Sequence, residues 1–165
     1  MSTPPGPQSQ AAFLPYMNFN QGIRINYPAD WRQMEQEAPA GFVVSFFSPP
    51  ESLTDRFSEN INVVLEPLEL DMTAYDYAQA CLRGISNGPI QFVENSEATV
   101  AGRQGYRWVY TGPLAIPGYD ISAKSMQCLT VSGRKGIVVT YTAEIDKYDK
   151  FLPIIQQMCD SLEIM

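Results

Sequence analysis

Histidine, the side chain that most often carries out acid–base chemistry, is missing from this sequence. Its possible nucleophiles have no basic residue at a spacing typical of a catalytic pair. The 165 residues include no histidine, so the commonest general base and the commonest metal ligand are absent. A serine or cysteine nucleophile would need a different base, and no spacing ties Lys124 or Lys135 to a particular serine. Walker A and Gly-x-Gly-x-x-Gly motifs are also absent. We therefore expect a protein that acts without catalysis and without a cofactor.

Three cysteines, Cys81, Cys128 and Cys159, are the remaining candidates for covalent or metal chemistry. The odd count and the absence of Cys-x-x-Cys spacing argue against a disulfide framework and against a zinc ribbon. Two of the three fall on the apolar faces of predicted helices, and free cysteine is among the most buried residue types. We expect reduced, buried thiols, with a single Cys81–Cys159 bridge as the alternative.

A long segment between two predicted strands, residues 48–60, combines consecutive prolines with apolar and charged side chains. Leu53 and Phe57 are apolar residues in a segment that should be exposed, which suits contact with a protein partner. The alternative is that Phe57 folds back onto the sheet. Asp55 and Glu59 could offer oxygen ligands to a hard cation, but the acidic residues lack EF-hand spacing, and we expect no metal site.

A second segment, residues 112–120, is predicted to be a loop and is apolar for its expected exposure. Leu114, Ile116 and Tyr119 are the side chains that give it this character. The Pro-Gly pair at 117–118 is typical of a tight turn. We expect these three residues, together with Leu53 and Phe57, to form the partner-binding surface.

Tyr106, Trp108 and Tyr110 alternate along one predicted strand and therefore point to one face of it. A row of aromatic rings could hold a flat ligand, which makes this face a candidate for ligand binding. The alternative is that the three rings form part of the core beneath a helix.

Composition excludes several classes of partner. Acidic residues outnumber basic ones by 18 to 11, which gives a net charge of −7, and no basic patch is visible. An acidic surface repels nucleic-acid phosphates and anionic membranes, so we expect neither as a partner. The sequence contains no apolar stretch of 18 residues, and we expect no membrane insertion.

The first 23 residues carry no charged side chain, so they lack the basic start of a signal peptide. We expect a cytoplasmic protein, with an exported form that has lost its leader as the alternative. Residues 1–15 are rich in Pro, Gly, Ser and Gln, which predicts a flexible leader. Residues 16–165 are expected to form a single domain.

Apolar periodicity predicts the elements of this domain. One helix should begin at Thr73, whose side chain can cap it, and a second should begin near Asp149 with Pro153 close to its first turn. The expected strands span residues 16–20, 23–27, 41–47, 61–66, 90–100, 106–111, 121–131 and 137–144. Because strands and helices do not alternate, we predict an α+β fold with a central, mainly antiparallel sheet flanked by helices.

Several short stretches, in their order and spacing over residues 16–164, resemble the PsbP-like superfamily. This group includes the extrinsic photosystem II subunit, its bacterial and archaeal relatives and a structurally similar Ran-binding nuclear import factor. The resemblance implies an α-β-α sandwich and non-catalytic roles in assembly and stabilisation, including photosystem-related ones. The stretches that carry it are GIRINYPADW at 22–31, FFSP at 46–49, ENINV at 59–63, VAGRQGY at 100–106, TYTAE at 140–144 and SLEI at 161–164.

A weaker resemblance, at Met126-Gln127 and residues 140–143, is to the cytoplasmic chaperones of type VI secretion effectors. The predicted function is therefore that of a protein-binding module of PsbP-like type, which assembles or stabilises a larger complex. The alternatives are a chaperone or adaptor for a secreted effector and a carrier of a small ligand. A homodimer is compatible with each of them.

Overall fold

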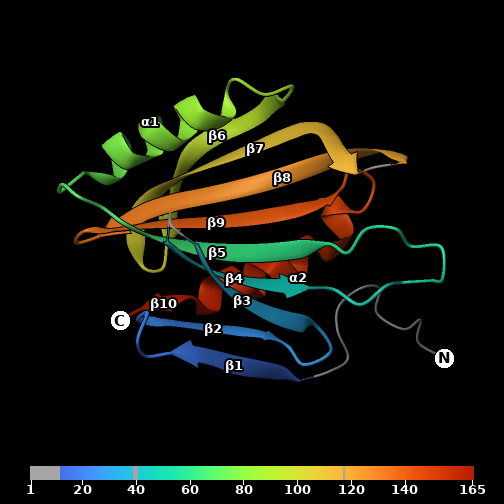
Figure 1. Cartoon of the computed structure of the whole chain (residues 1–165), viewed down its shortest axis with the longest axis horizontal. Helices are drawn as coiled ribbons and strands as arrows, with labels where there is room; N and C mark the ends of the chain where they lie inside the picture. The colour runs from blue at the N-terminus through green and yellow to red at the C-terminus, as the bar shows by residue number, and fades with distance from the viewer. Residues whose placement is uncertain (1–11, 39–40, 117) are drawn as a thin grey trace.

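The computed structural model describes residues 12–38, 41–116 and 118–165, which form two antiparallel sheets and two helices (Figure 1). The larger sheet has seven strands in the order β3-β4-β5-β9-β8-β7-β6, and the smaller has the order β1-β2-β10. The predicted α+β class is confirmed. The strands are β1 (Phe13–Asn18), β2 (Ile23–Pro28), β3 (Arg32–Ala38), β4 (Gly41–Phe47), β5 (Asn60–Pro67), β6 (Gln91–Val100), β7 (Arg103–Ile116), β8 (Tyr119–Ser132), β9 (Lys135–Glu144) and β10 (Glu163–Ile164).

The two helices lie on opposite faces of the larger sheet, so the layers form an α-β-α sandwich (Figure 1). Helix α1 (Ala74–Ile85) packs over β7 and β8, where Tyr77 and Ala78 meet Trp108 and Leu129. Helix α2 (Tyr148–Ser161) packs between β9 and the smaller sheet. The main core lies on the α2 side. Neither described helix is long and apolar enough to cross a bilayer.

Local sequence explains where α1 begins. The Thr73 hydroxyl oxygen accepts a hydrogen bond from the Asp76 backbone N–H at 3.0 Å, as predicted for its N-cap. The Asp76 carboxylate in the first turn also complements the positive end of the helix dipole. At the other end, the Ser86 backbone N–H bonds the Leu82 carbonyl and closes the helix.

The first and last strands of the described chain belong to the smaller sheet, beside α2. Strand β10 pairs with β2, opposing Glu163 to Arg24. The Asn26 backbone N–H donates to the Ser161 hydroxyl at 2.9 Å, which joins β2 to the end of α2. Trp31 is 5% exposed and meets the Phe151 ring edge-on, so it plugs the gap between the sheets.

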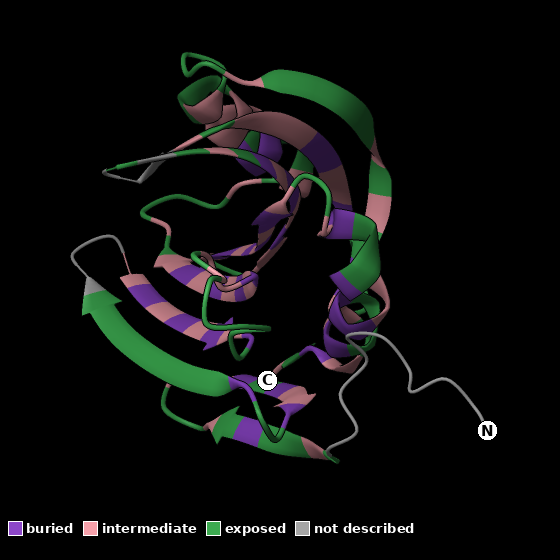
Figure 2. Cartoon of the chain, turned by 90° about the vertical axis from the view of Figure 1, so that its right-hand side faces the viewer, coloured by how far each residue is buried: buried purple, intermediate pink, exposed green. Residues whose placement is uncertain are grey.

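Strand β3 has no counterpart among the predicted strands. It is an edge strand, and its residues 32–37 are exposed on both faces (Figure 2). Its polar sequence therefore shows no alternation of apolar and polar residues. Strand β4 was expected to be central and covered on both sides. It is second from the edge, and only the Phe42, Val44 and Phe46 side is fully buried, because α1 does not extend over its other face.

The prediction of a loop over residues 112–120 is wrong. Strands β7 and β8 remain paired up to Ile116 and Tyr119, so this segment is the tip of a long hairpin. Strand β6 pairs with β7 only as far as Thr111, and none of the described strands pairs with that edge of β7 beyond this point. Pro113 is tolerated in the strand there because an edge strand needs only one set of ladder hydrogen bonds.

Two predicted boundaries also shift. Helix α2 begins at Tyr148, so Pro153 is its sixth residue and lies inside the helix, beyond the first turn. Strand β1 begins at Phe13 and so takes in the last three residues of the predicted leader, while residues 1–11 lie outside the described part.

The three cysteines are free, and the alternative Cys81–Cys159 bridge is not formed. Cys81 packs with the cluster beneath α1, whereas Cys159 packs with the main core on the other face of the sheet. Burial raises the pKa of Cys128 to about 11 and that of Cys159 to about 12, and it also raises the pKa of Cys81.

Native thiols should therefore alkylate slowly, because the thiolate is the reactive form. At pH 7.5 we expect Cys128 and Cys159 to react with iodoacetamide at least about 100-fold more slowly than free cysteine, whose pKa is about 8.5. Mass spectrometry of timed samples measures this, with urea-unfolded protein as the control for full labelling. Rapid labelling of either residue in the folded protein would contradict the described packing.

A close approach between Gly136 and Tyr77 sets how near α1 lies to the sheet. Tyr77 is 3% exposed, and its hydroxyl donates to Glu66 Oε1 at 2.8 Å. A Cβ atom at position 136 would overlap the Tyr77 ring. We expect Gly136→Ala to lower the free energy of unfolding by about 1–3 kcal/mol, as overpacking does.

Urea unfolding tests this interpretation with two further variants. Tyr77→Leu removes the ring, so adding Gly136→Ala to that background should cost much less than it costs alone. Gly84→Ala is the matched control, because a Cβ at that position in α1 meets nothing within 4 Å. It should leave stability unchanged or raise it by about 0.5–1 kcal/mol. Equal costs of Gly136→Ala in both backgrounds would refute the close approach.

Candidate functional site

The two segments predicted to bind a partner meet at one end of the larger sheet. Residues 48–59, which connect β4 to β5, lie beside the tip of the β7–β8 hairpin and the turn between β9 and α2 (Figure 1). We call this region the loop end. All three segments line a pocket of about 390 Å³, whose walls include Ser52, Arg56, Asp120, Ile121 and Lys147. The pocket is polar and charged.

The predicted contact residues are placed differently within the loop end. Leu53 is fully exposed. Phe57 and Leu114 are half-buried, and the Phe57 backbone N–H donates to Asp55 Oδ1 at 3.4 Å. The side chains of Ile116 and Tyr119 lie outside the described part of the chain. Leu53 is therefore the one predicted contact residue whose described side chain is wholly available to a partner.

The aromatic face is part of the core beneath α1. Trp108 is 1% exposed, and its indole N–H donates to Gln127 Oε1 at 2.9 Å. Tyr106 and Tyr110 are half-buried beside it. Their rings meet Tyr75 and Phe92 edge-on. A flat ligand cannot stack on Trp108 unless α1 moves away.

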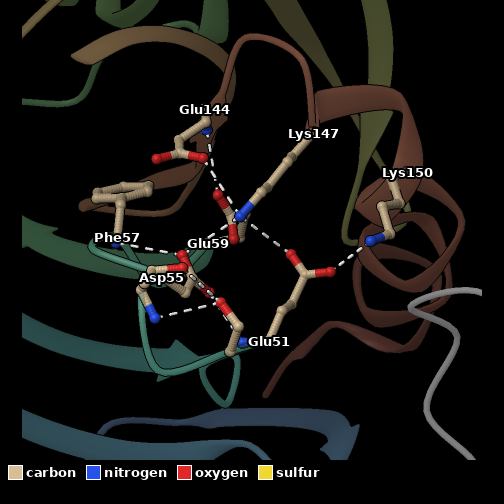
Figure 3. Close-up of polar contacts among 9 residues, drawn as sticks. Glu51, Asp55, Phe57, Glu59, Glu144, Lys147 and Lys150 are labelled. Atoms are coloured by element: carbon tan, nitrogen blue, oxygen red, sulfur yellow. Dashed lines mark hydrogen bonds and ion pairs between the residues drawn. The ribbon is translucent and has the colours of Figure 1, made fainter.

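A charged cluster closes the floor of the loop end around the Lys147 ammonium group (Figure 3). Lys147 Nζ lies 3.1 Å from Glu51 Oε1, 3.3 Å from Asp55 Oδ1 and 3.3 Å from Glu144 Oε2. Lys150, one helical turn further along, pairs with Glu51 Oε2. The cluster thus links residues 48–59 to the turn that leads into α2.

Backbone geometry places Lys147 at this point. Strand β9 ends at Glu144, the Lys147 backbone N–H bonds the Glu144 carbonyl at 2.9 Å, and α2 follows directly. Partial burial lowers the pKa of Lys147, but hydrogen bonds to Glu51, Asp55 and Glu144 outweigh it and hold the pKa above its ordinary value. The ammonium group stays charged throughout the physiological range.

Asp55 fixes the shape of the connection between β4 and β5. Its carboxylate accepts the Glu51 backbone N–H at 2.9 Å as well as the bonds from Phe57 and Lys147. Burial acts against the charged form, but these bonds outweigh it and lower the pKa of Asp55. Burial also opposes ionisation of Glu51, and hydrogen bonds from Lys150 and Lys147 lower its pKa in the same way.

Glu59 is the exception within the cluster. Its side chain is wholly buried, and Oε2 accepts the Glu144 backbone N–H at 3.2 Å. Oε1 is also buried but has no hydrogen-bond partner among the described residues. Burial therefore raises the pKa of Glu59. Sequence reasoning considered only Asp55 and Glu59 as oxygen ligands and expected no metal site. It passed over Glu51, four residues before Asp55 in the same segment, and it had no local signal for Glu144, which lies 85 residues beyond Glu59.

The expectation that the sequence has no Gly-x-Ser-x-Gly pattern is wrong, because residues 84–88 form one. In hydrolases this pattern exposes a serine at a sharp turn from a strand into a helix. Here Ser86 ends α1, and its hydroxyl donates to the Leu82 carbonyl at 2.6 Å. The pattern lies in the wrong structural context for a nucleophile.

Comparison of the sequence with protein-family models gives no match, and comparison with curated proteins gives none. Solved structures do match. The fold is similar to cyanobacterial PsbP (CyanoP) from Synechocystis sp. PCC 6803, with a TM-score of 0.62 and 16% identity, covering 96% of this chain and 95% of that one. The PsbP-like fold expected from the sequence is thereby confirmed.

Two further structures have the same fold. LpqN of Mycobacterium tuberculosis, involved in cell envelope biogenesis, has a TM-score of 0.59 and 18% identity, covering 95% of this chain and 92% of that one. The Ran-binding protein Mog1p of Saccharomyces cerevisiae has a TM-score of 0.59 and 9% identity, covering 94% and 96%. At these identities the likeness establishes the fold.

The raised pKa of Glu59 predicts how stability depends on pH. In the folded protein the pKa of Glu59 lies above its ordinary value of 4.5, so ionisation of this residue is less favourable in the folded state than in the unfolded state. The free energy of unfolding therefore falls as the pH rises above 4.5. Glu59→Gln removes the charge, and its amide can donate to neighbouring carboxylates. In metal-free buffer we expect the variant to be more stable at pH 7 by about 1–2 kcal/mol, the scale of an unsatisfied buried group.

Urea unfolding at several pH values measures the difference. It should shrink towards pH 4, where Glu59 of the unfolded and folded protein is largely protonated. Glu97→Gln, an exposed substitution on β6, is the control and should show no such trend. A variant that is less stable than the wild type at pH 7 would mean that ionised Glu59 is well stabilised.

Proposed function

We propose that this chain is a non-catalytic binding module that docks a protein partner at its loop end. The observation that carries the proposal is the convergence of three segments, distant in sequence, around one pocket with Leu53 fully exposed beside it. A protruding apolar side chain surrounded by charged groups has the composition of an interface centre with a polar rim.

The charged cluster supports the proposal because it makes the loop end a preformed surface. Lys147 and Lys150 hold Glu51 and Asp55 in place, and Asp55 in turn fixes the backbone of Glu51 and Phe57. Ordering a loop on binding costs conformational entropy, so a loop that is already held in place loses less of it.

The structural neighbours suggest, by analogy, the kind of process in which this chain acts. Mog1p is a Ran-binding protein, LpqN is involved in cell envelope biogenesis, and the third neighbour is a cyanobacterial PsbP. By analogy, this chain would act in the assembly or stabilisation of a larger complex, and a photosystem-related complex is one candidate. Fold-level analogy carries no information on which residues make the contact.

The two alternative functions have less support. A small-ligand carrier would use Tyr106, Trp108 and Tyr110, but these lie beneath α1. A chaperone would hold an apolar segment against the sheet. The face of β4, β5, β9 and β8 opposite the main core, however, has polar residues in one cross-strand row. The row contains Ser45, Asn62, Thr140 and Gln127.

Photo-crosslinking tests where the partner docks. A crosslinking amino acid at position 53 should capture a specific protein from a lysate of the native host, whereas the same amino acid at position 70 should not. Leu70 is the matched control because it is also exposed, at 74%, but lies beyond β5 at the other end of the sheet. Soluble and membrane fractions are kept apart, so that the fraction also narrows the kind of complex.

Substitution provides the quantitative version of this test. Leu53→Asp should weaken binding of the captured protein at least about tenfold, because it places a charge in the contact. It should leave the melting temperature unchanged, since Leu53 contacts little of its own chain. Leu70→Asp should bind as the wild type does. Loss of binding by both variants, or by neither, would contradict docking at the loop end.

A further inference from the structure

The geometry points to a binding site for a hard divalent cation of the size of Ca²⁺, formed at the loop end by the carboxylates of Glu51, Asp55 and Glu59. Glu144 lies at the edge of the same cluster and offers a fourth carboxylate. The cation site and the proposed partner surface share the charged cluster, but the partner contact itself rests on Leu53, so the two can be tested separately.

The unpartnered oxygen of Glu59 is the first argument. An ammonium group has three N–H donors, and Lys147 directs them to Glu51, Asp55 and Glu144. No Lys147 donor remains for Glu59 Oε1, which is buried without a partner among the described residues. A buried carboxylate oxygen in this position is costly unless something positive reaches it.

Charge balance is the second argument. The four carboxylates of the cluster face the two ammonium groups of Lys147 and Lys150. With all four carboxylates ionised, these six groups carry a net charge of −2. Arg56, which lines the same pocket as Asp55, Glu144 and Lys147, brings the local charge to −1. The excess of negative charge favours binding of a cation.

The spacing of the carboxylates allows one cation to reach all three residues. One carboxylate oxygen from each of Glu51, Asp55 and Glu59 lies within 4.8 Å of the others. Calcium–oxygen bonds are about 2.3–2.6 Å long, so two oxygens bound to one calcium ion can be up to about 5 Å apart. Calcium also accepts irregular sets of carboxylate ligands, whereas magnesium requires a near-ideal octahedron.

Lys147 competes for the same carboxylates, and the cation must displace its ammonium group. The Lys147 side chain is 23% exposed and lines the adjoining pocket, so it has room to move aside. Displacing it makes binding weak, and we expect a dissociation constant in the range of about 10⁻⁴–10⁻³ M, as in low-affinity calcium sites. Removing the Lys147 charge should therefore strengthen binding.

Calorimetric titration of the metal-free full chain with CaCl₂ tests the site, with MgCl₂ as the comparison. We expect calcium to bind one equivalent and to raise the melting temperature, and magnesium to bind at least about tenfold more weakly. Lys147→Met keeps the length of the side chain without its charge and should bind calcium at least about tenfold more tightly. Glu59→Gln should weaken calcium binding at least about tenfold, whereas Glu97→Gln should leave it unchanged.

Absence of calcium binding to the wild type up to about 10 mM would overturn the inference, and so would equal binding by the wild type and Glu59→Gln. Equal affinity for magnesium would overturn the assignment of size. Melting in metal-free buffer shows that each variant is folded, and Glu59→Gln remains decisive if Lys147→Met fails to fold. Crosslinking at position 53 in calcium-free buffer is a separate readout, so failure of the cation site is distinguishable from failure of the partner site.

Discussion

The fold depends on one helix that covers two sheets at once. A seven-stranded antiparallel sheet exposes apolar residues on one face along β4, β5 and β9, and these must be buried. Helix α2 packs on β9 and on β2, and β10 then pairs with β2, so the last residues of the chain bring the smaller sheet onto the same core. The Tyr141 and Tyr148 rings stack where β9 turns into α2, and Phe151 meets Trp31 at the border between the sheets. If α2 were displaced, both sheets would lose their common cover.

The loop end follows from the same arrangement. Because α2 must begin directly after β9, the turn between them lies at the end of the sheet where β4 connects to β5. Lys147 sits in that turn and Asp55 sits in that connection, so their ion pair joins the helix that closes the core to the loop proposed to bind a partner. A cation or partner acting on the loop end would therefore act on a rigid part of the structure, and its effect on stability should be measurable.

The sequence predicts the elements in which buried and exposed residues alternate regularly. It does not predict the elements in which they do not alternate. The Thr73 cap and the alternation in β5 and β9 marked these elements correctly, because capping and one-sided burial leave a local pattern. Strand β3 was missed because both of its faces are exposed. Residues 112–120 were predicted to be a loop because the pairing of β7 with β8 out to Ile116 and Tyr119 is visible only in three dimensions. For the carboxylate cluster, the sequence suggested only Asp55 and Glu59 as possible oxygen donors, and we expected no metal site there. These two share one segment with Glu51, but the positions of Glu144 and Lys147 depend on how β9 and α2 pack.

Glu59 is the residue of the cluster whose side chain does not suit its surroundings, because it is buried and its Oε1 has no hydrogen-bond partner among the described residues. Elsewhere in the cluster, ions and backbone donors satisfy the carboxylates, and the strands around it follow ordinary alternation. A glutamine at position 59 would keep the bond to Glu144 and could donate its amide protons to the neighbouring carboxylates, so stability alone would favour it over glutamate. Natural sequences violate such local rules mainly at functional sites, where the stability lost is compensated elsewhere. This carboxylate is buried beside those of Glu51 and Asp55. Its position therefore directs attention to a ligand with positive charge and not to the packing of the core.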